Sequence, residues 1–292
     1  MKKSKNSVTY GQSEDELIWK RFRQNKGAMM GLVVLCVIII VALSAPLFYD
    51  YDIDIIDMHV SERFTAPCRE HPFGTDNYGR DIFKRVVWGS RYSLSVGIVA
   101  TLIGLAIGVT LGSVAGYYGG IIENVIMRVT DIFSAVPNIL LGILITGTMG
   151  ANTLNLMLAV GIASVPQFTR ITRAAIMRVR DSDYVEACRS VGVKESRIIL
   201  LHILPNCLSP ILVQASLRVG SAVIATSSLS FLGLGVQQPA PEWGAMLSAG
   251  RDYIQQAPYL TLYPGLCIMI LVLSLNMIGD GLRDAFDPKL RR

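Results

Sequence analysis

The chain has 292 residues, of which 51% are hydrophobic and 17% charged, and its mean hydropathy is +0.45. Soluble domains carry about a quarter charged residues, so this composition excludes an ordinary water-exposed globular protein. The net charge of +5 favours basic loops beside anionic lipid over nucleic-acid binding.

Long uncharged stretches of the chain mark membrane spans, because a spanning helix needs about 20 mostly apolar residues. The stretch 132–169 is too long for one helix, and its small polar residues at 146–153 are typical of a tight turn between two helices. The sequence therefore predicts an all-α polytopic membrane protein. Its six transmembrane helices are expected near 28–48, 94–116, 129–148, 154–170, 207–230 and 257–279.

The N-terminal segment 1–27 is polar and basic. The apolar run after it, at 28–48, is longer than the core of a usual signal peptide and is predicted to be an uncleaved anchor. Lys and Arg also gather in the loop 171–206 and in the tail 286–292. Positive charges resist translocation, so this distribution predicts that both termini lie in the cytoplasm.

The segment 49–91, predicted to be a loop on the outer side, mixes acids and bases in turn-rich sequence. Two interpretations stay open for it: a surface that meets another protein or covers a pore mouth, and a structural knot that fixes the entry into the second span. Both also apply to the last outer loop, where Trp243 is most simply an interfacial anchor. The candidate side chains for an outer contact are Asp76, Arg80, Asp81, Glu242 and Trp243.

Between the fourth and fifth predicted spans, the sequence indicates two short helices that meet at an angle. Asp183 can cap a helix start, and Glu186 three residues later completes a capping box. Gly192 can supply the left-handed residue that ends this helix, and a second helix is expected to start near Lys194. Pro205 then interrupts the chain before the fifth span. Such a rigid protrusion suits docking into the groove of a partner, although an amphipathic loop lying on the membrane is the plainer interpretation.

Arg218 lies about midway along the fifth span, where a lone charge facing lipid costs about 3 kcal/mol or more. Gln214, Ser221 and Ser228 share its helical face, so the stripe indicates a water-accessible pathway. These four residues are the candidates for lining a pore, in which Arg218 could attract a substrate carboxylate. Burial against an acid of a companion subunit is the alternative.

Four motifs occur along the chain: Glu186-Ala187 with Gly192 and His202 to Pro205; His71 to Asp76 with Gly79 to Asp81; Ser230 to Gly235 with Pro241 to Gly244; and Gly279 to Asp284 with Asp287-Pro288. Together they resemble the permeases of bacterial ATP-binding-cassette importers for dipeptides, oligopeptides and nickel, and the similarity runs over about residues 20–292. The loop motif departs at one point, because Cys188 stands where the family often has Ala; both are small, so docking is expected to survive.

The resemblance is to the second, C-type permease of a heterodimeric pair. It implies a type I importer permease fold, with residues 92–285 as the transmembrane domain, in the bacterial cytoplasmic (inner) membrane. It also implies a companion permease, one or two ATP-binding subunits that hold ATP and magnesium, and an extracytoplasmic binding protein, toward which the outer candidates would face. This chain itself would bind no cofactor. The loop would be the coupling helix seated on the ATPase, and the residues implied for it are Asp183, Glu186, Ala187, Gly192, His202 and Pro205.

Other functional classes fit the sequence less well. A membrane enzyme is not indicated, because the chain shows no zinc-ligand spacing, no nucleophile elbow and no paired intramembrane acids. A channel or secondary transporter commonly carries intramembrane acids, whereas the centres of the predicted spans hold none. No Gly-Lys pair occurs, so a phosphate-binding P-loop is absent and the energy must come from another chain. Peptides are the expected substrate, and nickel or a metal–chelator complex is the alternative.

Overall fold

The computed structural model describes residues 14–286. The first half of the basic N-terminal segment (residues 1–13), the pair Asp287-Pro288 and the rest of the predicted cytoplasmic tail lie outside the described residues.

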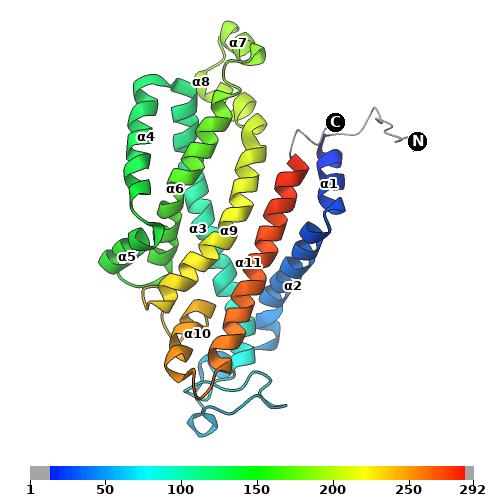
Figure 1. Cartoon of the computed structure of the whole chain (residues 1–292), viewed down its shortest axis with the longest axis vertical. Coiled ribbons are helices and arrows are strands. Elements are labelled where there is room, and N and C mark those ends of the chain that lie inside the picture. The colour runs from blue at the N-terminus through cyan, green and yellow to red at the C-terminus, as the bar shows by residue number, and fades with distance from the viewer. Residues whose placement is uncertain (1–13, 287–292) are drawn as a thin grey trace, which may run out of the picture.

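Helices make up most of the described chain, and the longest connections between them are the segments 57–81 and 232–242 (Figure 1). The α-helices are α1 (Glu14–Gln24), α2 (Lys26–Phe48), α3 (Ile82–Tyr118), α4 (Gly120–Ala135), α5 (Asn138–Met149), α6 (Thr153–Met177), α7 (Asp183–Ser190), α8 (Glu195–Ile198), α9 (Leu208–Phe231), α10 (Trp243–Gly250) and α11 (Tyr259–Phe286). Short π- or 3₁₀-helical turns lie at Tyr51–Ile56, Val60–Glu62, Ile199–Ile203, Pro205–Cys207 and Arg251–Tyr253.

Helices α2, α3, α6, α9 and α11 are each long and apolar enough to cross a membrane, and the pair α4–α5 makes a sixth span if it is counted as one. This confirms the predicted all-α fold with six membrane segments. The third segment, however, was expected as one helix over 129–148, and the structure bends it by 88° between α4 and α5. Pro137 causes the break, since the residue before a proline is pushed into extended conformation, and Val136 has φ −90° and ψ 126°.

Helix α3 begins earlier than the predicted second span and includes the last ten residues of the segment 49–91. Asp81 caps its start by accepting a hydrogen bond from the backbone N–H of Lys84 at 3.0 Å. The absence of charge marks where the apolar part of a span begins, and the helix extends beyond it over charged residues such as Lys84 and Arg85.

The most extensive helix packing joins α3 to α6, and glycines allow it. A Cβ atom at Gly108 would lie 2.4 Å from the Cβ of Phe168, and one at Gly112 would lie 2.6 Å from the carbonyl oxygen of Thr169. Only glycine fits at such distances, so these small residues allow α3 and α6 to approach closely.

Two ion pairs tie α4 to α6. Arg173 donates from Nε to the Glu123 carboxylate at 2.7 Å, and Arg170 donates to Asp131 at 2.8 Å. Glu123, Arg170 and Arg173 lie in the halves of α4 and α6 nearer to α7, and Asp131 lies in the half of α4 that leads to α5.

The bundle has two distinct ends (Figure 1). The α7 end carries α7 and α8 together with α1 and the last turn of α11, whereas the α10 end carries α10 and the segment 49–81. The largest buried cluster lies toward the α10 end, where Trp243 and Met246 pack against Ile82, Val86 and Leu260.

Candidate functional site

The first candidate site is the α7–α8 protrusion, residues 183–198. Ser182 occupies the N-cap position of α7, so Asp183 is the first helical residue and the predicted capping box does not form. Asp183 and Glu186 nevertheless lie in the first turn, where negative charge interacts favourably with the helix dipole.

Helix α7 ends as the sequence predicts. Gly192 has φ +76°, its N–H donates to the carbonyl of Arg189 at 2.9 Å, and the N–H of Val193 donates to the carbonyl of Cys188 at 3.1 Å. This pair of bonds is a Schellman motif, which needs a left-handed residue at the position of Gly192. Lys194 then precedes α8, so the second helix begins where it was expected.

Buried side chains fix the protrusion to the spans. Val185 of α7 and Ile198 of α8 are fully buried in one cluster with Tyr117 of α3 and Ile176 of α6. Arg189 adds a hydrogen bond from Nε to the Tyr117 hydroxyl at 3.3 Å. These contacts join α7 directly to the ends of α3 and α6, and sequence reasoning did not identify this anchor.

The opposite side of the protrusion is open to solvent. Glu186, Ala187 and Gly192 are exposed, and the Glu186 carboxylate has no hydrogen bond or ion pair within residues 14–286. Pro205 begins the turn that leads into α9, and the carbonyl of the half-buried His202 accepts a hydrogen bond from Asn206 at 2.7 Å. The predicted residues thus form one exposed platform and the connection behind it.

The second candidate site is a cavity of about 380 Å³ beside α9. It contains three of the four predicted pore residues, Arg218, Ser221 and Ser228, whereas Gln214 lies outside its lining. The start of α5 at Pro137 and Asn138 closes one side. Sequence reasoning missed this contribution, although a proline inside an apolar run is a usable signal for a helix break.

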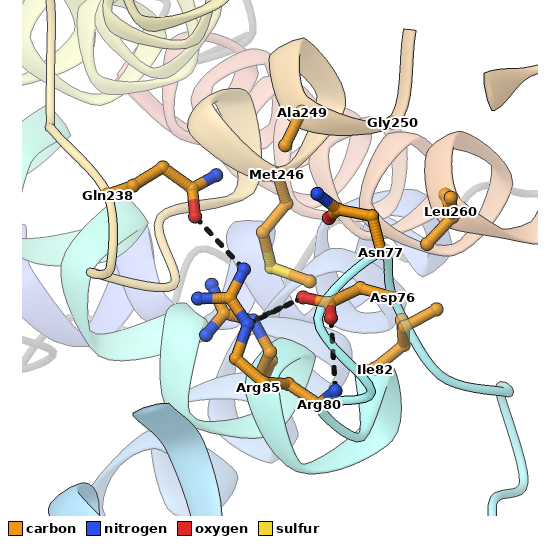
Figure 2. A pocket seen from close by; sticks show the side chains of 10 residues that line it. All are labelled: Asp76, Asn77, Arg80, Ile82, Arg85, Gln238, Met246, Ala249, Gly250 and Leu260. Atoms are coloured by element: carbon orange, nitrogen blue, oxygen red, sulfur yellow. Dashed lines mark hydrogen bonds and ion pairs between the residues drawn. The ribbon is translucent and has the colours of Figure 1, made fainter. Parts of the chain in front are cut away.

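At the α10 end, the charged candidates are buried, which contradicts the expectation that they face a docked protein. Asp76, Arg80 and Asp81 are 8%, 3% and 7% exposed. Figure 2 shows Arg80 between Asp76 and Gln238, with Nε donating to Asp76 at 2.7 Å and a terminal nitrogen donating to the Gln238 side chain at 3.1 Å. Arg85 lies beside them (Figure 2) and donates to the carbonyls of Ile55 at 2.7 Å and Pro239 at 3.1 Å. The bonds from Arg80 to Gln238 and from Arg85 to Pro239 join segments more than 150 residues apart, as the structural-knot interpretation requires.

Glu242 and Trp243 belong to the same knot. Trp243 is 2% exposed and donates from its indole N–H to the carbonyl of Val86 at 2.9 Å, so it is not an interfacial anchor. Glu242 is 1% exposed and caps α10 by accepting from the N–H of Ala245 at 2.8 Å. Burial raises the pKa of the Glu242 carboxyl, while hydrogen bonds from Gly244, Ala245, Ser230 and Ser93 act in the opposite direction.

Comparison with known proteins identifies relatives over nearly the whole chain. Residues 108–292 match the family of binding-protein-dependent transport system inner membrane components, and residues 16–67 match the N-terminal transmembrane domain of oligopeptide transport permease C. The dipeptide transport system permease protein DppC of Alkalihalophilus pseudofirmus is 46% identical, covering 94% of this chain and 89% of that protein. DppC of Haemophilus influenzae is 38% identical, with 94% of each chain covered.

Further similarities extend to another named substrate and to solved structures. The glutathione transport system permease protein GsiD of Pectobacterium atrosepticum is 42% identical, covering 94% of this chain and 90% of that protein. Among solved structures, a chain of the methionine ABC transporter MetNI in an inward-facing conformation superposes with a TM-score of 0.57 at 18% identity, covering 70% of this chain and 98% of that one. At this identity the structural similarity shows the fold alone.

Proposed function

Because this chain belongs to the family of binding-protein-dependent transport system inner membrane components, we propose that it is a permease subunit of an ATP-driven importer for di- and oligopeptides. The named substrates of its relatives, dipeptides and glutathione, support the choice of peptides. The structural observation that carries the proposal is the α7–α8 protrusion, which is exposed on one side and anchored to α3 and α6 on the other.

The α7 end faces the cytoplasm in this proposal, and the α10 end faces outward. Lys and Arg residues of α1 and of the connection between α6 and α9 lie at the α7 end, which agrees with the retention of positive charge on the cytoplasmic side. Both termini are then cytoplasmic, and the protein is a multi-pass protein of the bacterial inner membrane.

The chain works with partners that supply the steps it lacks. A companion permease completes the pathway, one or two ATP-binding subunits hold ATP and magnesium, and a binding protein delivers the peptide on the outer side. This chain catalyses no reaction and binds neither cofactor nor nucleic acid. The absence of a P-loop from its sequence supports this division of roles.

Coupling proceeds through the platform formed by Glu186, Ala187 and Gly192. Closure of the ATPase dimer around ATP pulls α7, and the buried contacts of Val185 and Ile198 pass the movement to α3 and α6. The spans then face outward and accept the peptide, and hydrolysis returns them. Because the platform is rigid, the movement is transmitted instead of being absorbed by a flexible loop.

The test is uptake of labelled dipeptides, oligopeptides and nickel in cells that lack this chain, with and without restored expression. Restored peptide uptake is the expected result. If only nickel uptake is restored, the chain is an importer permease but its substrate is nickel and not a peptide. Nickel is the second candidate because the sequence motifs are shared with nickel permeases. If neither returns while the partner subunits are expressed, the proposed function is wrong.

A further inference from the structure

Arg218 is a charged residue without a partner inside a membrane span. It lies near the middle of α9, and within residues 14–286 its guanidinium forms no hydrogen bond or ion pair. Most other charged residues of the described spans lie toward the helix ends, and several of them are paired, such as Arg173 with Glu123. Arg128 lies near the middle of α4 but is exposed, whereas Arg218 is half-buried. A lone cation at this depth is costly, so its position calls for a ligand or a partner.

The surroundings of Arg218 are built for an anion. The cavity of about 380 Å³ lies within the size range of small-molecule sites, and no Asp or Glu lines it. Ser221 and Ser228 donate their hydroxyl protons to the carbonyls of Leu217 at 3.4 Å and Ile224 at 2.8 Å. The guanidinium and the side-chain amide of Asn138 therefore supply the free side-chain donors of this cavity within the described residues, and the planar fork of the guanidinium matches a carboxylate.

Small residues keep space open in front of Arg218. Ala163 of α6 and Ala222 and Ala225 of α9 line the cavity, where larger side chains would fill it. The first turn of α5 also borders the cavity, with no side-chain cap at Pro137, and its dipole adds positive potential of the same sign.

We propose that Arg218 and this cavity bind the carboxylate of the transported peptide as it crosses the membrane. The group concerned is the free C-terminal carboxylate, because it is common to peptides whose side chains differ. This inference rests on the proposed function and adds a substrate feature that the permease itself recognises. The alternative, an acid of the companion permease paired with Arg218, is an outcome of the test.

The test measures the charge preference of the cavity in the assembled complex in proteoliposomes, with and without ATP. Ser221 is exposed and one helical turn from Arg218, so Ser221→Cys is introduced after the five native cysteines have been replaced by Ala or Ser. The probes are the anionic sulfonatoethyl and the cationic trimethylammonioethyl methanethiosulfonate. Each probe's rate with Ser221→Cys is divided by its rate with a free thiol, and the measured ratio is the anionic value over the cationic value. We expect this ratio to exceed one when Arg218 is present. Arg218→Gln should lower it by about tenfold, because a nearby cation attracts the anionic probe and repels the cationic one at an intermediate dielectric constant.

Two controls keep the result interpretable. Arg128→Gln removes one positive charge from an exposed position outside the cavity lining and is expected to leave the ratio unchanged. If Arg218→Gln prevents assembly, the comparison uses intact Arg218, with Ser228→Cys as the second position. That position lies farther along α9 and should show a weaker anion preference than Ser221→Cys.

Protection by substrate tests the carboxylate directly. A dipeptide with a free C-terminus should slow modification of Ser221→Cys at concentrations at which its C-terminal amide does not, and Arg218→Gln should abolish this protection. Equal protection by the amide would overturn the inference, as would a probe ratio that does not respond to Arg218→Gln. If the complex assembles and the ratio does not change in Arg218→Gln, Arg218 is paired with an acidic residue of the companion permease. Failure of the proposed function is read separately, from peptide uptake by the chain with Arg218 intact.

Discussion

At the scale of single residues, the α10 end is held by charged groups that the sequence alone places on a surface. Arg85 is 1% exposed and reaches carbonyls of two segments that are distant in the sequence. A buried guanidinium is tolerated because each of these bonds satisfies one of its donors. Lysine could not replace it, since an ammonium group on a flexible stem does not reproduce the fork of donors.

The Glu242 carboxyl gives a pH-dependent prediction. Its pKa is raised in the folded protein, so the folded state binds more protons than the unfolded state between the ordinary and the raised pKa. Stability is therefore expected to fall as pH rises through this window. Glu242→Gln, which keeps an acceptor for Ala245 but cannot ionise, should flatten the dependence. The midpoint of thermal unfolding of the purified complex, followed from acidic to neutral pH, checks this.

The matched variant Glu242→Ala separates charge from hydrogen bonding. It leaves the N–H of Ala245 without its acceptor, which should cost about 1–3 kcal/mol at every pH. If the Gln variant instead retained the full pH dependence of the wild type, another group would be responsible for it.

The residue scale also shows the limit of the sequence. Trp243 was interpreted as an interfacial anchor because tryptophan is common there, but its neighbours Val86 and Ser93 come from α3, about 150 residues earlier. A loop residue is buried only when such distant segments pack together, and the local sequence pattern does not predict that packing. The unpaired charge at Arg218, in contrast, was visible because an uncharged span surrounds it.

At the scale of elements, local chemistry explains which predictions held. The end of α7 was predictable because a Schellman motif depends on one glycine and its immediate neighbours. The start was misplaced by one residue, because Ser182 and Asp183 are both good N-cap types and sequence alone does not choose between them. The bend between α4 and α5 was missed because the apolar run continues through Pro137. An apolar run indicates that a segment lies in the membrane, but it does not indicate the direction of the helix.

Gly192 provides the prediction at this scale. No atom would meet a Cβ there within 4 Å, so the cost of Gly192→Ala arises from its positive φ alone, at about 1–2 kcal/mol. We expect this variant to distort the platform and to lower peptide transport per ATP hydrolysed. Gly192→Asn, which tolerates the left-handed conformation better, should retain more of the coupling. The ratio of transported peptide to released phosphate in proteoliposomes measures this, and equal ratios in both variants and the wild type would show that the turn does not matter for coupling.

At the scale of the whole molecule, the two ends of the helix bundle differ in structure. Its α7 end offers an exposed platform with a buried anchor, and its α10 end is a closed knot of hydrogen bonds that holds the helices in register. In the proposed mechanism, movement applied at the platform reaches a bundle that is held at the α10 end, and the spans between the two ends reorient. The cavity beside α9 lies along these spans, where such a reorientation can change its access.

The measurement that tests the central claim most directly is ATP-dependent accumulation of a labelled dipeptide by proteoliposomes containing this chain, its companion permease, the ATP-binding subunits and the binding protein. The account predicts accumulation that requires ATP and this chain. It also predicts that Glu186→Ala abolishes most of the accumulation without changing folding stability by more than about 0.5 kcal/mol, because the side chain is exposed and its carboxylate is unpaired within residues 14–286. Full accumulation by the Glu186→Ala complex, or accumulation by the wild-type complex without ATP, would contradict it.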